Sequence, residues 1–354
     1  MRAEQVLAFR FARVGLARRN GGSLAEAAAC PASAFARDAD LMALSARRES
    51  LTREEYDEAV DSQQVVLAHI IRGAIHVLAP GDLLLFGRAL VGRDDKELTA
   101  QIGRKFGRVD ALEEVTDATE DALRGGRALT KDELHDELRG RVRAELLPWC
   151  KSCGSHHVDP SLWRYATVKA GARLDSERRY LLGKRGRTPP AAEAVRRFLG
   201  FYGPATAGDF AEWAGVTRSH ADRIWAEVEE ELSKTTVGRR GAWMLPDDVA
   251  ELESPPPAEG VRLIPPGDPY LAKPNRPLLA SDAGLRKRLF RPVASPGAVL
   301  KDGRLAGLWR VKVKGKAVEI SVEKLGRVSR AELEPEAERI AALRGAAEPA
   351  LILS

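Results

Sequence analysis

The sequence predicts an α+β fold that is mainly α, with a winged-helix unit and a small β-rich domain at the C-terminal end. Three observations lead to this prediction. Residues 191–246 read as three short helices followed by a basic hairpin, which is the winged-helix pattern. Capping boxes and apolar residues at three- and four-residue spacing recur through residues 1–253. Residues 254–354 instead show alternating strands separated by Asp-Gly and Lys-Gly turns.

Length and composition limit the classes of protein to consider. A chain of 354 residues is long enough for several domains with cores of their own. Its net charge of +5 favours an anionic partner. Three cysteines argue against a disulfide framework and are typical of a reducing cytoplasm. No apolar run reaches the roughly 18 residues of a membrane span, and the N-terminus reads as an amphipathic helix. We therefore expect a cytoplasmic protein without a membrane segment.

Residues 1–95 are predicted to hold several helices followed by a hairpin. Thr52, with Glu55 three residues on, forms a capping box at the start of one helix. The stretch VVLAHIIRGAIHVLAP (65–80) reads as two strands with Gly73 at the turn between them. Helices followed by a hairpin repeat the winged-helix pattern in outline.

Residues 96–190 continue the helical pattern in their first half. Thr130 begins a capping box with the glutamate three residues on, and a short helix should follow it. In the segment 148–175 the helical pattern stops, and the run around Trp163 reads as a strand.

The same segment holds a cluster of residue types that bind metals. Two thiolates and one or two imidazoles within eight residues can supply three or four tetrahedral zinc ligands, and the residues are Cys150, Cys153, His156 and His157. Structural zinc sites usually draw their ligand pairs from two separated segments. The alternative is therefore a turn with small buried thiols and a histidine bonded to the backbone, with no cofactor at all.

Within residues 191–253, a third helix capped by Thr217 is expected to carry basic residues on its outward turns. In winged-helix proteins this helix usually enters the major groove, and the wing tip touches phosphate or the minor groove. The candidate contacts on the helix and on the wing tip are Arg218, His220, Arg223, Arg239 and Arg240. A solvated charged face, or a role in protein interaction, is the alternative interpretation.

Residues 254–354 are predicted to form a small antiparallel sheet or barrel, closed by a helix at 330–345. The window 285–330 holds thirteen Lys or Arg against three Asp or Glu. Such a basic strand either binds phosphate or protects a sheet edge from pairing with another chain. The candidate contacts on this strand are Arg310, Lys312 and Lys314.

Five segments, in order, carry a resemblance to one family: RGAIHVLAPGDL, PWCKSCGSHHV, RRFLGFYGPATAGDFAEWAGV, GDPYL and DGRLAGLWR. From about residue 1 to 330 the chain resembles the winged-helix DNA-binding proteins that include the crosslink-unhooking alkylpurine DNA glycosylases of the AlkZ/YcaQ type. The resemblance implies three tandem winged-helix units, over 1–95, 96–190 and 191–253, followed by a small antiparallel β-barrel-like domain over 254–354. It also implies double-stranded DNA, damaged DNA included, as the partner of a monomer that uses no cofactor.

The resemblance further implies where catalysis would occur. Active members use a short motif in the first unit: Gln, in some branches His, then an apolar residue, then Gln or Asp. Counting back from the apolar run that ends at Arg47 places this motif at Ser33-Ala34-Phe35. A carboxamide or carboxylate there would position water for attack on C1′ of an oxocarbenium-like sugar. Ser33 holds water weakly and Phe35 has no polar atom, so we expect a DNA-binding protein that has lost the family's catalytic motif.

Two other functions stay open. A local shift would bring Asp38 to the site and give an active alkylpurine glycosylase, although this carboxylate also suits a helix cap or the surface. A winged-helix transcription regulator would need a dimer to read spaced half-sites. Arg72 and His76 lie on the hairpin that, in the family, is beside the active-site region, so both are candidate DNA contacts. A histidine satisfied by the backbone within the core is the alternative for His76.

Overall fold

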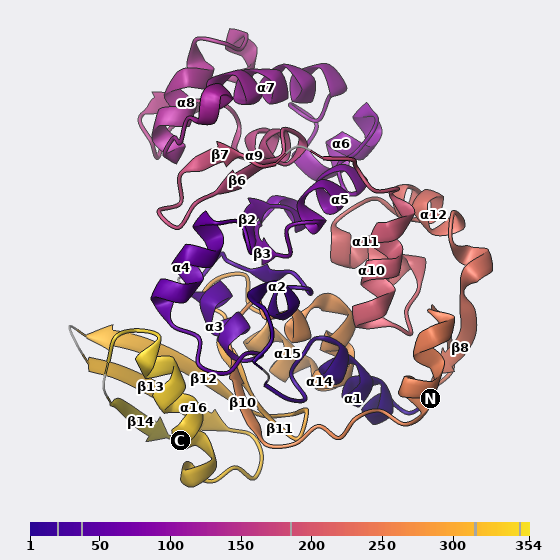
Figure 1. Cartoon of the computed structure of the whole chain (residues 1–354). Helices are drawn as coiled ribbons and strands as arrows, with labels where there is room; N and C mark the ends of the chain where they lie inside the picture. The colour runs from indigo at the N-terminus through magenta and orange to yellow at the C-terminus, as the bar shows by residue number, and fades with distance from the viewer. Residues whose placement is uncertain (20, 37, 185, 315–316, 347) are drawn as a thin grey trace. The chain divides into compact units, whose positions relative to one another are not determined.

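The structure is a computed structural model that describes residues 1–19, 21–36, 38–184, 186–314, 317–346 and 348–354 (Figure 1). The contacts of the chain divide it into two compact units. Unit 1 comprises Met1–Tyr56, Phe198–Thr206 and Glu231–Ser354, and unit 2 comprises Asp57–Arg197 and Ala207–Glu230. No helix of the described residues is both long enough and apolar enough to cross a membrane.

The fold is α+β, as predicted, and helices α4 and α10 each contribute to both units (Arg53–Asp61 and Ala192–Tyr202). The other α-helices of unit 1 are α1 (Ala3–Arg13), α2 (Leu24–Ala27), α3 (Ala39–Ser45), α13 (Val249–Glu253), α14 (Arg276–Leu279), α15 (Ala283–Leu289) and α16 (Arg330–Ala342). Its strands are β1 (Ala32–Ser33), β8 (Ser233–Val237), β9 (Arg240–Met244), β10 (Val261–Ile264), β11 (Gly297–Lys301), β12 (Arg304–Lys314), β13 (Ala317–Lys324) and β14 (Pro349–Leu353). The division into 1–95, 96–190, 191–253 and 254–354, and the count of winged-helix units, stay predictions.

Local sequence signals explain how unit 1 begins. The predicted amphipathic helix at the N-terminus is α1, which buries Val6 and Phe9 against Met244 and Leu252. Thr52 caps α4 as expected, because its hydroxyl accepts from the backbone N–H three residues on. Helix α1 and the β8–β9 hairpin thus share one small apolar core.

The C-terminal sheet differs from the antiparallel barrel-like domain that we expected. Its order is β10-β11-β12-β13-β14, it is open, and β14 runs parallel to β13. The cause is α16, which connects β13 to β14 and packs against β10 and β14. Helix α16 buries Leu333 and Ile340. It therefore covers apolar residues of the open sheet, which in a closed barrel would lie in the interior.

Unit 2 is built around a four-stranded antiparallel arrangement in the order β3-β2-β6-β7. The two strands predicted within 65–80 are confirmed, and Gly73 between them has a φ of +62°. The α-helices of unit 2 are α5 (Asp82–Ala89), α6 (Asp95–Ile102), α7 (Val109–Ala122), α8 (Lys131–Arg139), α9 (Pro160–Lys169), α11 (Ala207–Ala214) and α12 (Arg218–Ala226). Its strands are β2 (Val66–His69), β3 (Ile75–Leu78), β4 (Trp149–Cys150), β5 (Ser155–His156), β6 (Ala172–Leu174) and β7 (Tyr180–Leu182).

The strand predicted around Trp163 is wrong, because this run forms helix α9. The Asp159 carboxylate accepts from the backbone N–H groups of Ser161 and Leu162, and Pro160 occupies the first helical turn. Asp-Pro at this position is a helix start signal. It outweighs the β propensity of the bulky residues that follow it, and α9 packs against α7.

Candidate functional site

Ser33 and Phe35, where the family's catalytic motif is expected, lie at the end of β1 and just after it. The Phe35 side chain is 81% exposed, and its backbone N–H donates to the Ser33 hydroxyl at 3.4 Å. The Ser33 N–H donates to the carbonyl of Gly267 at 3.2 Å. Gly267 has a φ of +84°, and a Cβ there would lie 2.8 Å from the Ser33 Cβ, so this close approach needs glycine. Neither motif position carries a carboxamide or a carboxylate.

Arg47, at the other end of residues 33–47, is held by a buried ion pair. The Arg47 guanidinium binds both oxygens of Asp268, at 2.8 and 3.0 Å, and also donates to the carbonyls of Val14 and Ala43. Both side chains are at most 3% exposed. Burial opposes the charge of Arg47, but the Asp268 carboxylate outweighs burial and raises the pKa of Arg47. Asp268 belongs to the GDPYL segment, so the ion pair joins one of the segments that carry the family resemblance to Arg47, which ends the apolar run from which the motif is placed.

The two carboxylates near the motif are both engaged. Asp38 does not cap α3; it forms ion pairs with Arg53 at 2.5 Å and Arg344 at 3.2 Å. It also lines a cavity of about 560 Å³ in unit 1. Asp40 is 1% exposed and accepts a hydrogen bond from the Tyr56 hydroxyl at 2.7 Å. A water bound to Asp38 would therefore compete with two guanidinium groups, and Asp40 is part of the core.

Both histidines proposed as DNA contacts are buried in unit 2. His76 lies 2.8 Å, at Nδ1, from the carbonyl of Ala74, and burial lowers its pKa to about 4, so the ring is neutral at pH 7. His220 is 1% exposed and lies 2.9 Å from a backbone carbonyl. The expectation that His220 points outward is wrong, because it shares the buried face of α12 with Ile224 one turn on.

The arginines proposed in unit 2 are more accessible. Arg72 is exposed, and its guanidinium donates to a backbone carbonyl. On α12, Arg218 is exposed and pairs with Asp222 at 2.7 Å, whereas Arg223 pairs with Glu97 at 2.6 Å. Among these three side chains, Arg72 and Arg218 present the more open cationic surface.

Further candidate cations lie in unit 1. Arg239 and Arg240 are exposed at the tip of the predicted β8–β9 hairpin, and Arg240 also donates to the Thr206 hydroxyl at 2.9 Å. Arg310 and Lys312 are exposed on β12. The backbone of Lys314 belongs to β12 as well, but its side chain lies outside the described residues.

The Cys/His segment comes together in part. Cys150, Cys153 and His157 place one ligand atom each within 4.8 Å of one another. His156 is not in this group and instead lies 2.8 Å, at Nδ1, from the carbonyl of Leu147. Hydrogen bonds to Cys150, led by the one from the side chain of Ser152, lower the pKa of its thiol to about 6.

A family model described as DNA glycosylase AlkZ-like matches residues 35–343. The chain belongs to the AlkZ-like DNA glycosylase family. It is 25% identical, over 285 residues and 75% of each chain, to the interstrand DNA cross-link repair glycosylase of Streptomyces sahachiroi. The solved structure of the Streptomyces sahachiroi DNA glycosylase AlkZ has the same fold, with a TM-score of 0.79 and 21% identity over the whole of both chains.

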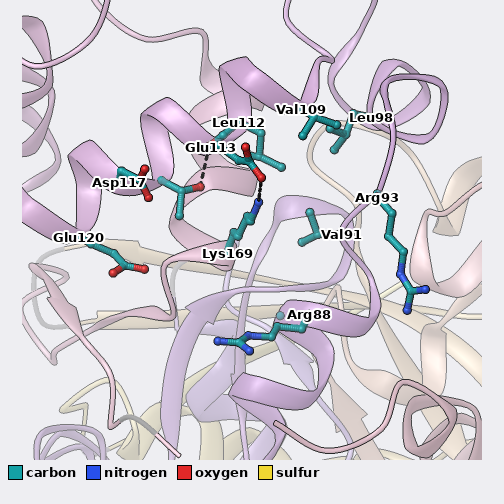
Figure 2. A pocket seen from close by; sticks show the side chains of 13 residues that line it. Arg88, Val91, Arg93, Leu98, Val109, Leu112, Glu113, Asp117, Glu120 and Lys169 are labelled. Carbon is teal, nitrogen blue, oxygen red and sulfur yellow. Dashed lines mark hydrogen bonds and ion pairs between the residues drawn. The ribbon is translucent and has the colours of Figure 1, made fainter.

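The AlkZ-like chain also has a cleft of about 660 Å³ in unit 2, where an acidic wall follows α7 (Figure 2). The charged side chains that line it are three basic and three acidic: Arg88, Arg93, Lys169, Glu113, Asp117 and Glu120. Lys169 is already paired with Glu113 at 3.4 Å. A phosphate-binding cleft needs a surplus of positive charge, so this cleft does not suit a DNA backbone.

Proposed function

We propose that this AlkZ-like protein binds double-stranded DNA, alkylated or crosslinked DNA included, without cleaving the glycosidic bond. The observation that carries the proposal is Phe35, an exposed aromatic side chain where the family mechanism needs a group that positions water. Hydrolysis requires a polar side chain within hydrogen-bond reach of the attacking water. Ser33 offers one hydroxyl, which already accepts from the Phe35 N–H.

The exposed cations support binding to duplex DNA. Arg239 and Arg240 on the β8–β9 hairpin, together with Arg310 and Lys312 on β12, offer positive charge to phosphates. Phosphate contacts supply most of the affinity for DNA and fix the position of a protein on the duplex. None of these side chains is buried, so each can reach a backbone without rearrangement of a core.

Phe35 adds a means of recognising disturbed DNA. An apolar side chain exposed on a DNA-binding surface stacks on an unpaired base or enters between base pairs that a lesion has loosened. A bulky adduct lowers the cost of unstacking, so it favours such a contact. At the motif position the phenyl ring of Phe35 thus contacts a damaged base, where a catalytic side chain would position water.

The test is binding of a labelled duplex, with and without one N7-alkylguanine, across a series of salt concentrations. We expect log K to fall linearly with log[salt], and the double variant Arg239→Ala/Arg240→Ala to reduce the slope by about 2. Arg108→Ala is a matched control, because Arg108 is an exposed arginine already paired with Asp110. A flat salt dependence would contradict DNA binding through phosphates.

An active glycosylase that uses Asp38 is the second candidate, because Asp38 lies beside the motif and lines the 560 Å³ cavity. Its two guanidinium partners argue against it. If Asp38 were the catalytic carboxylate, the protein would excise an alkylated base and Asp38→Asn would abolish the excision.

A further inference from the structure

We propose that Cys150, Cys153 and His157 bind one zinc ion. Their three ligand atoms already lie within 4.8 Å of one another in unit 2. Two thiolates with one imidazole form a donor set that zinc takes in proteins, at Zn–S distances of about 2.3 Å and Zn–N distances of about 2.0 Å. Closing the group onto an ion needs only small side-chain movements.

The backbone brings the two thiols together. Strands β4 and β5 form a hairpin whose turn ends at Gly154, with a φ of +61° that glycine adopts without strain. The Gly154 N–H donates to the carbonyl of Cys150 at 2.9 Å, so the turn folds Cys153 back over Cys150. The Ser152 hydroxyl lies 3.1 Å from the Cys150 Sγ and supports that sulfur from inside the turn.

The hydrogen bond of His157 fixes which ring nitrogen can bind a metal. Its Nδ1 lies 2.7 Å from the carbonyl oxygen of Val158. A carbonyl only accepts, so Nδ1 carries the proton and Nε2 keeps its lone pair. Metal-binding histidines usually donate their other ring N–H to a carbonyl or carboxylate in this way. His157 is 8% exposed, so the ring is also held in place by its surroundings.

Two neighbouring groups help to define the site. His156 is exposed and bonded to the carbonyl of Leu147, outside the group of three. Cys153 is exposed, so solvent can supply a water as the fourth ligand. On binding, each thiol that was protonated releases its proton and forms a sulfur–zinc bond. The ion then ties the turn of the β4–β5 hairpin to His157, which directly follows β5 and lies three residues before the start of α9.

The experiment uses the full-length protein, purified under reducing conditions, stripped with a chelator and titrated with zinc chloride alone. We expect one zinc per chain, and at least a tenfold loss of affinity in Cys150→Ser and in His157→Gln. His156→Gln and Cys30→Ser are matched controls that keep wild-type affinity, because neither residue belongs to the group of three. Replacement of zinc by Co²⁺ in the wild-type chain should give a thiolate-to-cobalt charge-transfer band and tetrahedral ligand-field absorption.

The cobalt spectrum of the wild-type chain keeps the test independent of whether a variant folds. Three outcomes would overturn the proposal: no stoichiometric zinc, unchanged affinity in a folded Cys150→Ser variant, or a cobalt spectrum without thiolate bands. None of these measurements involves DNA, so the zinc site stands or falls separately from the proposed function.

Discussion

The two ends of residues 33–47 differ in what holds them and in what they offer to a ligand. At the far end, Arg47 is buried and bound through two hydrogen bonds to Asp268, 221 residues along the chain. At the near end, Phe35 is 81% exposed. The buried end has the polar partners that a folded core demands, and the exposed end carries neither a carboxamide nor a carboxylate at the motif positions.

We infer from this difference that the residues that hold the fold and the residues proposed for the chemistry are separate, although both lie within fifteen positions of the sequence. The Arg47–Asp268 ion pair and the two segments that it joins, the one around Arg47 and the GDPYL loop, form the frame of this site. Phe35 projects from that frame, so this residue can change without loss of the frame. A family match over 35–343 therefore reports the frame and not the activity.

The largest effect is expected at the buried end. Arg47→Ala leaves the Asp268 carboxylate buried without its cation and should lower the free energy of unfolding by about 3–5 kcal/mol. Arg47→Lys should recover only part of this, because an ammonium cannot bind both oxygens in the fork geometry of a guanidinium. Urea denaturation measures both. Arg53→Ala removes a more exposed partner of Asp38 and should lower the free energy of unfolding by less than about 1 kcal/mol. An equal loss in Arg53→Ala and Arg47→Ala would contradict the difference between the two ends.

Restoring the family motif tests whether the rest of the protein can still support base excision. The double variant Ser33→Gln/Phe35→Gln supplies two carboxamides, and we expect excision of N7-alkylguanine at least about a hundredfold above the uncatalysed rate. Single-turnover gel assays with alkaline cleavage of abasic sites measure this rate. Ser33→Asn/Phe35→Leu provides a matched control without the second carboxamide. A restored variant that binds DNA but never excises would show that more than the motif has been lost.

Gly267→Ala probes the contact between the two ends. The new Cβ would lie 2.8 Å from the Ser33 Cβ at a φ of +84°, so we expect a loss of about 1–3 kcal/mol in the free energy of unfolding. Ser33→Gly should relieve the contact but not the backbone strain. The double-mutant cycle then gives a favourable coupling between the two substitutions, and strict additivity would mean that Ser33 is not the residue in contact.

The smallest effect on stability is expected at Phe35. Phe35→Ala should change the free energy of unfolding by less than about 0.5 kcal/mol, because the ring is exposed. The same variant should weaken binding to lesion-containing duplex about tenfold, the loss of one stacking contact. Phe35→Trp should retain the affinity. A large stability loss with unchanged DNA affinity would assign Phe35 to packing instead.

Local signals in the sequence predicted the elements that depend on local physics. The strands within 65–80, the capping box at Thr130 and the hairpin with Arg239 at its tip all follow from spacing, caps and turns. The run around Trp163 was misread because short bulky runs suit a helix or a strand equally, and the preceding Asp-Pro signal decided it. His220 was placed on the wrong face of α12, since the burial of a helix face depends on its neighbours.

Features that join distant residues were beyond sequence reasoning. The Arg47–Asp268 ion pair links two segments whose individual composition gives no sign of partnership. The parallel pairing of β14 with β13 depends on the path of α16, and with it the sheet stays open. Of the Cys/His candidates, three come together and His156 does not, because its ring bonds to the backbone.

We propose that the frame at Arg47 persists while the chemistry at the motif is absent, and base excision by the wild-type chain tests this proposal most directly. A duplex with one N7-alkylguanine is incubated with excess protein, and abasic sites are cleaved with alkali. We predict intact strands at protein concentrations that saturate binding. Strand cleavage by the wild-type protein that disappears in Asp38→Asn would contradict the account and establish an active glycosylase with a displaced carboxylate.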